Sequence, residues 1–152
     1  MVDASASELE AVDFSPFAAA AHAPFAMTAH ITYTALDPSA PATFSPIVIG
    51  RTIRTTIGFT SALMSDDLSM GALDGSLATR ATRALDAGCD LVLYCNAKAA
   101  EMAEIAPRVP RLEGAPAERV ARAQAAIRLP VEPAEASELA AALERLLDLA
   151  ED

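Results

Sequence analysis

The sequence predicts an α/β fold built around a parallel sheet. Three short apolar runs, 25–31, 61–65 and 90–94, do not alternate with polar residues. Continuous apolar runs of this kind are typical of strands that are covered on both faces. Helical patterns lie between and after the three runs. Because strands that alternate with helices are joined by right-handed crossovers, this order predicts parallel strands in one sheet.

The helices between the predicted strands carry start and stop signals. Ser45 suits the N-cap of one helix, and Gly58 is placed to end it. Gly88 follows the next helix in the same way. Arg51 and Arg54 lie on a helix face and are expected to be solvated instead of functional. In chain order, the predicted helices are 16–22, 45–57, 74–87, 97–106, 116–128 and 134–149.

Composition disfavours two classes of partner. The 152-residue chain has a formal net charge of −10, which disfavours electrostatic binding to nucleic acid or to an anionic membrane. No apolar run reaches the ~20 residues that cross a bilayer, and residues 1–10 lack the layout of a signal peptide.

Cys89 and Cys95 match no zinc or redox spacing and are expected to be reduced thiols. We therefore expect a cytoplasmic protein without a metal or cofactor.

Two adjacent carboxylates, Asp66 and Asp67, come directly after the second predicted strand. Parallel barrels build their active sites at this edge of the sheet. Because an unpaired buried charge is costly, a carboxylate there needs a functional or structural reason. Asp66 could attack the anomeric carbon of a sugar or stabilise positive charge there. The alternative is a helix cap or a hydrogen-bonded structural carboxylate. Because neighbouring strand residues point to opposite faces, Asp67 is expected to anchor loop backbone instead.

Further polar residues are predicted at the same edge. His30 ends the first predicted strand, where it could bind a substrate hydroxyl or be a satisfied structural group. Asn96 follows the third strand, where it could shape a pocket floor or cap the next helix. Tyr33 and Asp37 are weaker candidates on the loop after His30.

Several collinear segments of the chain resemble one known family. They are FAMTAHITY at 25–33, PATFS at 41–45, GF at 58–59, MSDDLSM at 64–70 and AGCDLVLYCN at 87–96. Together they look like the bacterial β-N-acetylhexosaminidases of glycoside hydrolase family 3, which act in peptidoglycan recycling. The resemblance extends from about Asp13 to Asn96. An unrelated α/β domain would need these matches to arise in order by chance. The MSDDLSM segment is specific enough to favour a catalytic role for Asp66.

The resemblance implies part of a (β/α)8 TIM-type barrel. A complete barrel needs ~250 residues, and the three predicted strands resemble the last three of eight. We therefore expect residues 1–130 to form the C-terminal portion of that barrel, about three β/α units plus C-terminal helices. Residues 131–152 are expected to form a helix that packs on this domain.

The resemblance also implies site residues and a mechanism. Asp66 matches the family's nucleophile, which forms a covalent glycosyl intermediate in a retaining mechanism. His30 and Asn96 are expected substrate-binding residues at the same edge. The family's Asp-His acid/base loop, and the Lys-His and Arg groups that hold N-acetylglucosamine, belong to earlier strands and have no match in this chain.

The expected function is removal of terminal N-acetylglucosamine from peptidoglycan fragments, so the expected substrate is a muropeptide or oligosaccharide that contains this sugar. The alternative is a catalytically incomplete fragment that acts only by binding or association. General acid assistance contributes ~10²–10⁴ in rate, so we expect weak or no hydrolysis by the chain alone. An open sheet edge also predicts self-association or pairing with a missing N-terminal half.

Overall fold

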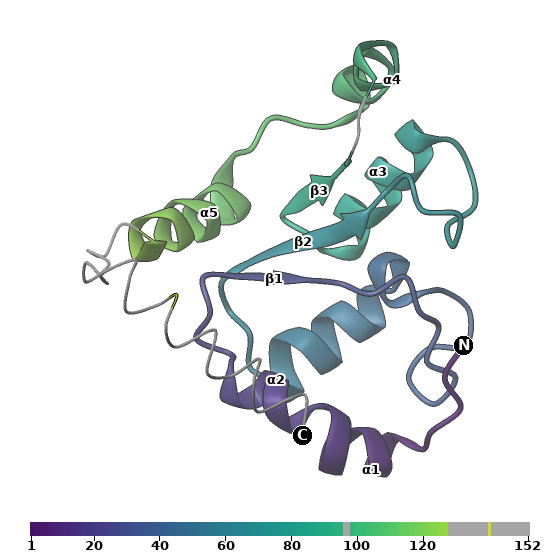
Figure 1. Ribbon diagram of the computed structural model, residues 1–152, viewed down its shortest axis with the longest axis vertical. Coiled ribbons are helices and arrows are strands. Elements are labelled where there is room, and N and C mark those ends of the chain that lie inside the picture. The colour runs from purple at the N-terminus through teal and green to yellow at the C-terminus, as the bar shows by residue number, and fades with distance from the viewer. Residues whose placement is uncertain (96–97, 128–139, 141–152) are drawn as a thin grey trace.

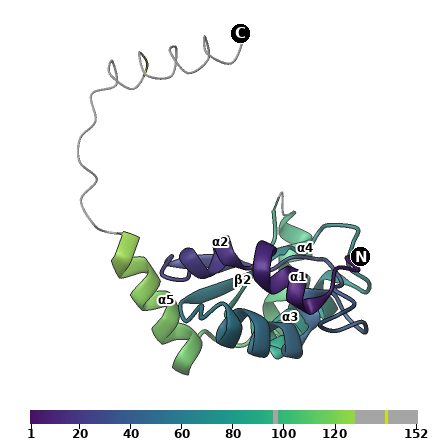
Figure 2. The same ribbon diagram turned by 90° about the horizontal axis from the view of Figure 1, so that it is seen from below.

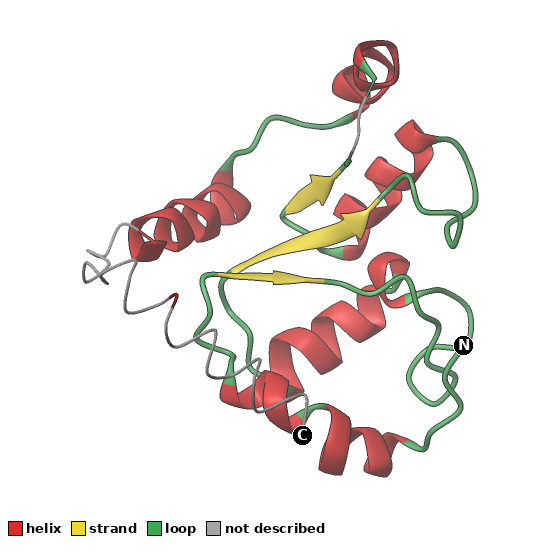
Figure 3. Cartoon of the chain, viewed as in Figure 1, coloured by secondary structure: helices red, strands yellow, loops and turns green. Residues whose placement is uncertain are grey.

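The computed structural model describes residues 1–95, 98–127 and 140, and a three-stranded parallel sheet lies at its centre (Figure 1). The strands are β1 (Phe25–Met27), β2 (Ala62–Asp67) and β3 (Leu91–Leu93), in the spatial order β1-β2-β3. Phe25 is in register with Ala62, and Met64 is in register with Leu91. All three arrows point the same way in Figure 3. The predicted parallel α/β arrangement is therefore confirmed.

Helices precede, separate and follow the strands. Three short helices come before β1, namely α1 (Ala6–Glu8), η1 (Leu9–Asp13) and α2 (Ser15–Ala19). Those between strands are η2 (Ala42–Phe44), η3 (Val48–Thr56) and α3 (Leu77–Ala87). Those after β3 are α4 (Ala99–Ile105), η4 (Ala106–Arg108) and α5 (Gly114–Ile127). The helix predicted at 134–149, and with it the packing expected of 131–152, falls outside the described residues apart from Ala140.

The predicted capping signals act as expected. The Ser45 hydroxyl accepts the Val48 N–H at 3.0 Å at the start of η3, and the Ser76 hydroxyl accepts the Thr79 N–H at the start of α3. Gly88 ends α3 in the left-handed region, with a φ of 115°, which costs a residue without a Cβ little. η3 differs from the regular helix predicted there, because its hydrogen bonds span five residues, as from the Ile57 N–H to the Thr52 carbonyl.

Two strands differ in length from the prediction. β1 ends at Met27 instead of residue 31, because the carbonyls of Ala29 and Ile31 accept N–H groups of residues 43 and 42 and not those of a neighbouring strand. β2 continues to Asp67 instead of residue 65. The two aspartates are therefore the last residues of the central strand, and they do not follow it.

Two apolar clusters cover the sheet. Ala26, Leu63 and Val92 belong to the larger one, which also contains side chains of η3, α3 and the Phe59 loop. On the smaller one, Ala62 packs with Val120 and Ala123 of α5, together with Phe25 and Leu91. In Figure 1, α5 stands beside the amino-terminal ends of the strands, and Figure 2 shows it at one end of the molecule. Helices therefore reach both sides of the sheet, and the carboxyl ends of the strands lie away from α5.

A buried carboxylate joins the sheet to two helices at this amino-terminal end. The Asp90 side chain is 1% exposed, and its Oδ2 accepts the Leu63 N–H at 2.9 Å. Arg54 of η3 donates to Oδ2 at 2.9 Å, and Arg119 of α5 donates to both oxygens. Arg54 also donates to the carbonyl of Ser61 at 2.7 Å. The expectation that Arg54 is solvated is wrong, because its guanidinium satisfies this buried charge; Arg51 is exposed as expected.

Replacing Asp90 with alanine should lower the free energy of unfolding by about 3–5 kcal/mol. Arg54 and Arg119 would lose their shared counter-ion, and the buried Leu63 N–H would lose its acceptor. Urea denaturation followed by far-UV circular dichroism measures the change. The control is Asp74→Ala, since Asp74 pairs with Arg83 on the surface and is 83% exposed, and exposed pairs contribute little. Equal losses in the two variants would contradict the role given to Asp90.

The two cysteines should differ sharply in reactivity. Cys89 is buried in the larger apolar cluster, and burial raises the pKa of its thiol to about 12, whereas Cys95 is exposed. Because the thiolate is the reactive form, a thiol-reactive disulfide reagent at pH 8 should label Cys95 quickly and Cys89 only after denaturation. The Cys95→Ser variant should lose the fast phase. Two thiols that react at one rate in the native protein would contradict this assignment.

Candidate active site

Polar side chains gather at the carboxyl ends of the three strands. Asp66 and Asp67 end β2, His30 lies on the loop after β1, and Cys95 lies just after β3. The N-terminal residues reach the same edge, because Val2 forms an isolated parallel bridge with Tyr33. Figure 3 shows the loops that surround the arrowheads. The topology therefore brings the predicted site residues of β1 and β2 to one edge.

Asp66 lies where the pairing between β2 and β3 is irregular. Met64 is in register with Leu91 and Asp67 with Leu93, so β2 has one more residue than β3 across this interval. Bulges of this kind re-aim side chains and are common beside active sites. The Asp66 carboxylate is partly buried, and its Oδ1 accepts the N–H of Asp67 at 2.8 Å. Within the described part of the chain no hydrogen bond to Oδ2 is found, so this oxygen has no partner there.

Asp67 ties the ends of two strands together. Its Oδ1 accepts the N–H groups of Ser69 and Cys95, each at 3.0 Å, and its Oδ2 accepts the Ser69 hydroxyl at 2.5 Å. The hydrogen bonds from Ser69 lower the pKa of Asp67, and the bond from Cys95 and the nearby His30 act in the same direction. The prediction that Asp67 anchors loop backbone is therefore confirmed. A carboxyl group that stays ionised in this way is a poor proton donor.

His30 connects the β1 loop to the end of β2. Its Nε2 lies 2.9 Å from the Asp67 carbonyl, and its Nδ1 lies 2.7 Å from the Thr43 hydroxyl. Since a carbonyl oxygen only accepts, Nε2 carries a proton. Both ring nitrogens are thus engaged within the protein, and a sugar hydroxyl would have to compete with these partners for His30.

The weaker candidates have structural contacts. Asp37 is buried, and it accepts the N–H and hydroxyl of Ser39 and, at 2.5 Å, the hydroxyl of Ser45. It therefore supports the N-cap of η3. Burial raises the pKa of Tyr33. Asn96 falls outside the described residues, so its predicted role stays a prediction.

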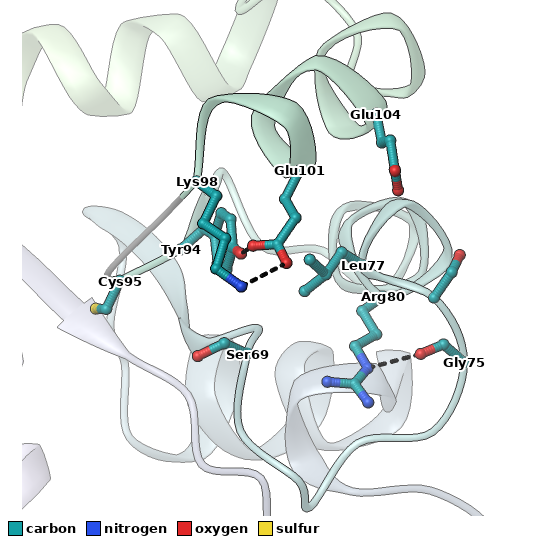
Figure 4. A pocket seen from close by; sticks show the side chains of 10 residues that line it. Ser69, Gly75, Leu77, Arg80, Tyr94, Cys95, Lys98, Glu101 and Glu104 are labelled. Atoms are coloured by element: carbon teal, nitrogen blue, oxygen red, sulfur yellow. Dashed lines mark hydrogen bonds and ion pairs between the residues drawn. The ribbon is translucent and has the colours of Figure 1, made fainter.

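An open cleft of about 650 Å³ lies beside this edge, between the start of α3 and α4 (Figure 4). Lys98 and Glu101 form an ion pair at 3.7 Å, and the Tyr94 hydroxyl donates to Glu101. Arg80 donates to the carbonyls of Leu68, Met70 and Gly75. Asp66 does not line this cleft. The lining residues are Ser69, Gly75, Ser76, Leu77, Arg80, Tyr94, Cys95, Lys98, Glu101 and Glu104.

Sequence analysis missed the charged residues of this cleft. The spacing of Lys98 and Glu101, three apart at a helix start, is a signal that could have identified their pairing. Arg80 carried no signal, because its partners are backbone carbonyls of the loop after β2. In residues 1–95 and 98–127 no cluster of metal-binding side chains is found. No helix of the described chain is long and apolar enough to cross a bilayer.

The free energy of unfolding should fall as the pH drops below about 4. Hydrogen bonds from Ser39 and Ser45 lower the pKa of Asp37 in the folded state. The unfolded chain therefore takes up this proton first, so the stabilisation is complete above the unfolded pKa and disappears as the pH passes through the lower folded pKa. Urea titrations between pH 6 and pH 3 should show a shallower decline for Asp37→Asn. An identical slope in Asp37→Asn and in the exposed-site control Asp86→Asn would contradict this.

The family model that describes the glycosyl hydrolase family 3 N-terminal domain matches residues 1–129. A beta-hexosaminidase from Alkalilimnicola ehrlichii is 48% identical over 94 residues, which are 59% of this chain and 27% of that protein. One from Neisseria meningitidis serogroup C is 45% identical over 96 residues, or 60% of this chain and 26% of that protein. The chain thus spans about a quarter of the length of these curated relatives.

Solved structures show the same likeness. NagZ from Neisseria gonorrhoeae, in complex with N-trifluoroacetyl-D-glucosamine, is 31% identical with a TM-score of 0.66 over 84% of this chain and 40% of that one. A family 3 β-N-acetylglucosaminidase from Paenibacillus shares the fold, with a TM-score of 0.72 at 23% identity over 90% of this chain and 29% of that one. The family model covers most of the chain, and the SDDLSM segment lies at the sheet edge, where β2 ends at its second aspartate. The chain therefore belongs to glycoside hydrolase family 3, as part of its N-terminal domain.

Proposed function

We propose that this chain supplies the nucleophile, Asp66, of a retaining β-N-acetylhexosaminidase. The single observation that carries the proposal is the state of Asp66. It ends the central strand of a parallel sheet, and one carboxylate oxygen is held by the next amide while the other has no partner among the described residues. A nucleophile needs one such oxygen to form the bond to the anomeric carbon.

The acid/base group would come from outside these 152 residues. A retaining enzyme needs a second group ~5 Å from its nucleophile. Asp67 is a poor donor because hydrogen bonds hold its pKa low, and both nitrogens of His30 are engaged. We therefore propose that β1, β2 and β3 correspond to the last three of the eight strands of a (β/α)8 barrel, and that the earlier strands carry the proton donor. Residues 1–130 would then be the C-terminal portion of that barrel.

The proposed substrate is a terminal N-acetylglucosamine of a peptidoglycan fragment, as in peptidoglycan recycling. Support comes from the relatives, which are beta-hexosaminidases, and from the N-trifluoroacetyl-D-glucosamine complex of one structural neighbour. His30 and Asn96 remain the proposed substrate contacts. We also propose a cytoplasmic location, since both cysteines are free thiols and reduced thiols are typical of reducing compartments.

One observation favours association as a second candidate function. In the described chain β1 pairs with β2 only, so its outer edge is open. Met27 on this strand is 50% exposed, and Phe17 of α2 is 64% exposed. Open edges and exposed apolar side chains promote pairing with another chain. The fitting partner is a run of parallel strands, supplied by the rest of a family 3 barrel or by a second copy.

Activity should appear only when the chain is combined with the rest of the barrel. We would mix it with the N-terminal portion of a family 3 relative and measure release of a chromophore from an aryl N-acetylglucosaminide. The chain alone should be inactive, the mixture active, and Asp66→Ala should abolish activity, since the glycosyl ester cannot form. The matched control Asp86→Ala, an exposed aspartate of α3, should leave activity unchanged. Activity that survives Asp66→Ala would refute the nucleophile, and light scattering would show whether the two parts associate.

A further inference from the structure

The residues on either side of Asp66 bind β3 in an unusual way. In a parallel pair, N–H groups of one strand ordinarily donate to backbone carbonyls of its neighbour. Here the Leu93 N–H donates to the Ser65 hydroxyl at 3.0 Å, and the Cys95 N–H donates to the Asp67 carboxylate at 3.0 Å. Two side chains of β2 thus accept N–H groups at the end of β3, in addition to the backbone pairing of the two strands.

These side-chain hydrogen bonds coincide with the irregular register. Between Met64 and Asp67, β2 advances three residues while β3 advances two, from Leu91 to Leu93. The extra length falls on Ser65 and Asp66. Regular pairing resumes where the Leu68 N–H donates to the Leu93 carbonyl at 2.9 Å. The Ser65 and Asp67 side chains therefore bridge the interval that contains Asp66.

A third contact fixes the backbone after Asp66. The Asp67 carbonyl accepts two hydrogen bonds, one from the His30 Nε2–H at 2.9 Å and one from the Met70 N–H at 3.2 Å. The N–H of the same residue donates to Asp66 Oδ1. Ser65 is fully buried, so no water can take the place of its hydroxyl as the acceptor of the Leu93 N–H. Asp67 is consequently held from the β1 side through its carbonyl and from the β3 side through its carboxylate.

We propose that Ser65 and Asp67 are positioning residues for Asp66, with His30 as their support on the β1 side. By holding β3 through side chains, they accommodate one extra residue in β2 and keep the Asp67 N–H on Asp66 Oδ1. This N–H fixes the carboxylate and leaves Oδ2 free for the anomeric carbon. The inference rests on the proposed role of Asp66 as nucleophile.

Amide NMR of the isotopically labelled chain tests this without requiring activity. The first readout is hydrogen exchange at Leu93 and Cys95. The second is the chemical-shift change of the residue-67 amide proton as the pH is varied. The part of this change that disappears in Asp66→Asn reports ionisation of Asp66. The variants are Ser65→Ala, Asp67→Ala and the conservative Asp67→Asn, with Asp86→Ala as the matched surface control.

Loss of one hydrogen bond should speed exchange about threefold to tenfold. We expect this at Leu93 in Ser65→Ala and at Cys95 in Asp67→Ala, and in both variants the residue-67 shift should shrink. Asp67→Asn keeps an acceptor oxygen and should retain the slow Cys95 exchange. In the reconstituted enzyme, Ser65→Ala should lower kcat and leave KM near its wild-type value.

A residue-67 shift of wild-type size in Ser65→Ala and Asp67→Ala would overturn the proposal, even if exchange accelerates, because the two side chains would then only hold β3. If Asp67→Ala does not fold, Ser65→Ala decides on the same two readouts. Failure of the nucleophile assignment is distinguishable, since activity would then survive Asp66→Ala whatever the amide spectra show.

Discussion

The buried charge of Asp90 is the constraint on which the rest of the sheet depends. Asp90 is the last loop residue before β3. Its carboxylate accepts the Leu63 N–H of the central strand. Two arginines from η3 and α5 neutralise it. A single side chain thereby sets how β3 starts beside β2 and which two helices close that end. Removal of Asp90 would leave both guanidinium groups without their shared counter-ion, which is strongly destabilising.

The two ends of the sheet are held by different chemistry. The amino-terminal end uses charge, through Asp90 and its two arginines. The carboxyl end uses side-chain hydrogen bonds to backbone N–H and C=O groups, made by Ser65, Asp67 and His30. This second arrangement accompanies the one-residue step between β2 and β3 at Asp66, the proposed nucleophile.

Residue patterns predicted the layout of this fold well, because capping and apolar runs are local signals. Ser45 and Gly88 mark helix ends that the structure confirms. Contacts between distant residues could not be predicted in this way. Arg54 meets Asp90 across 36 residues, and β1 is short because its last residues pair with a loop.

The same limit applies to the site. Asp67 could be predicted as a backbone anchor, since neighbouring strand residues differ in orientation. Its bond to Cys95, 28 residues away, and the bond of His30 to the Asp67 carbonyl depend on the sheet order. The family resemblance identified Asp66 from a short motif, whereas its single hydrogen bond and irregular register appear only in three dimensions.

The most direct measurement is the identity of the residue that becomes glycosylated. A 5-fluoro-N-acetylglucosaminyl fluoride transfers its sugar to a retaining nucleophile, breaking the bond to the anomeric fluorine and forming an ester that hydrolyses slowly. After incubation of the reconstituted enzyme with this reagent, mass spectrometry of the proteolytic peptides should find the sugar on Asp66. Attachment to any other residue, or continued turnover of substrate after Asp66 is removed, would contradict the account.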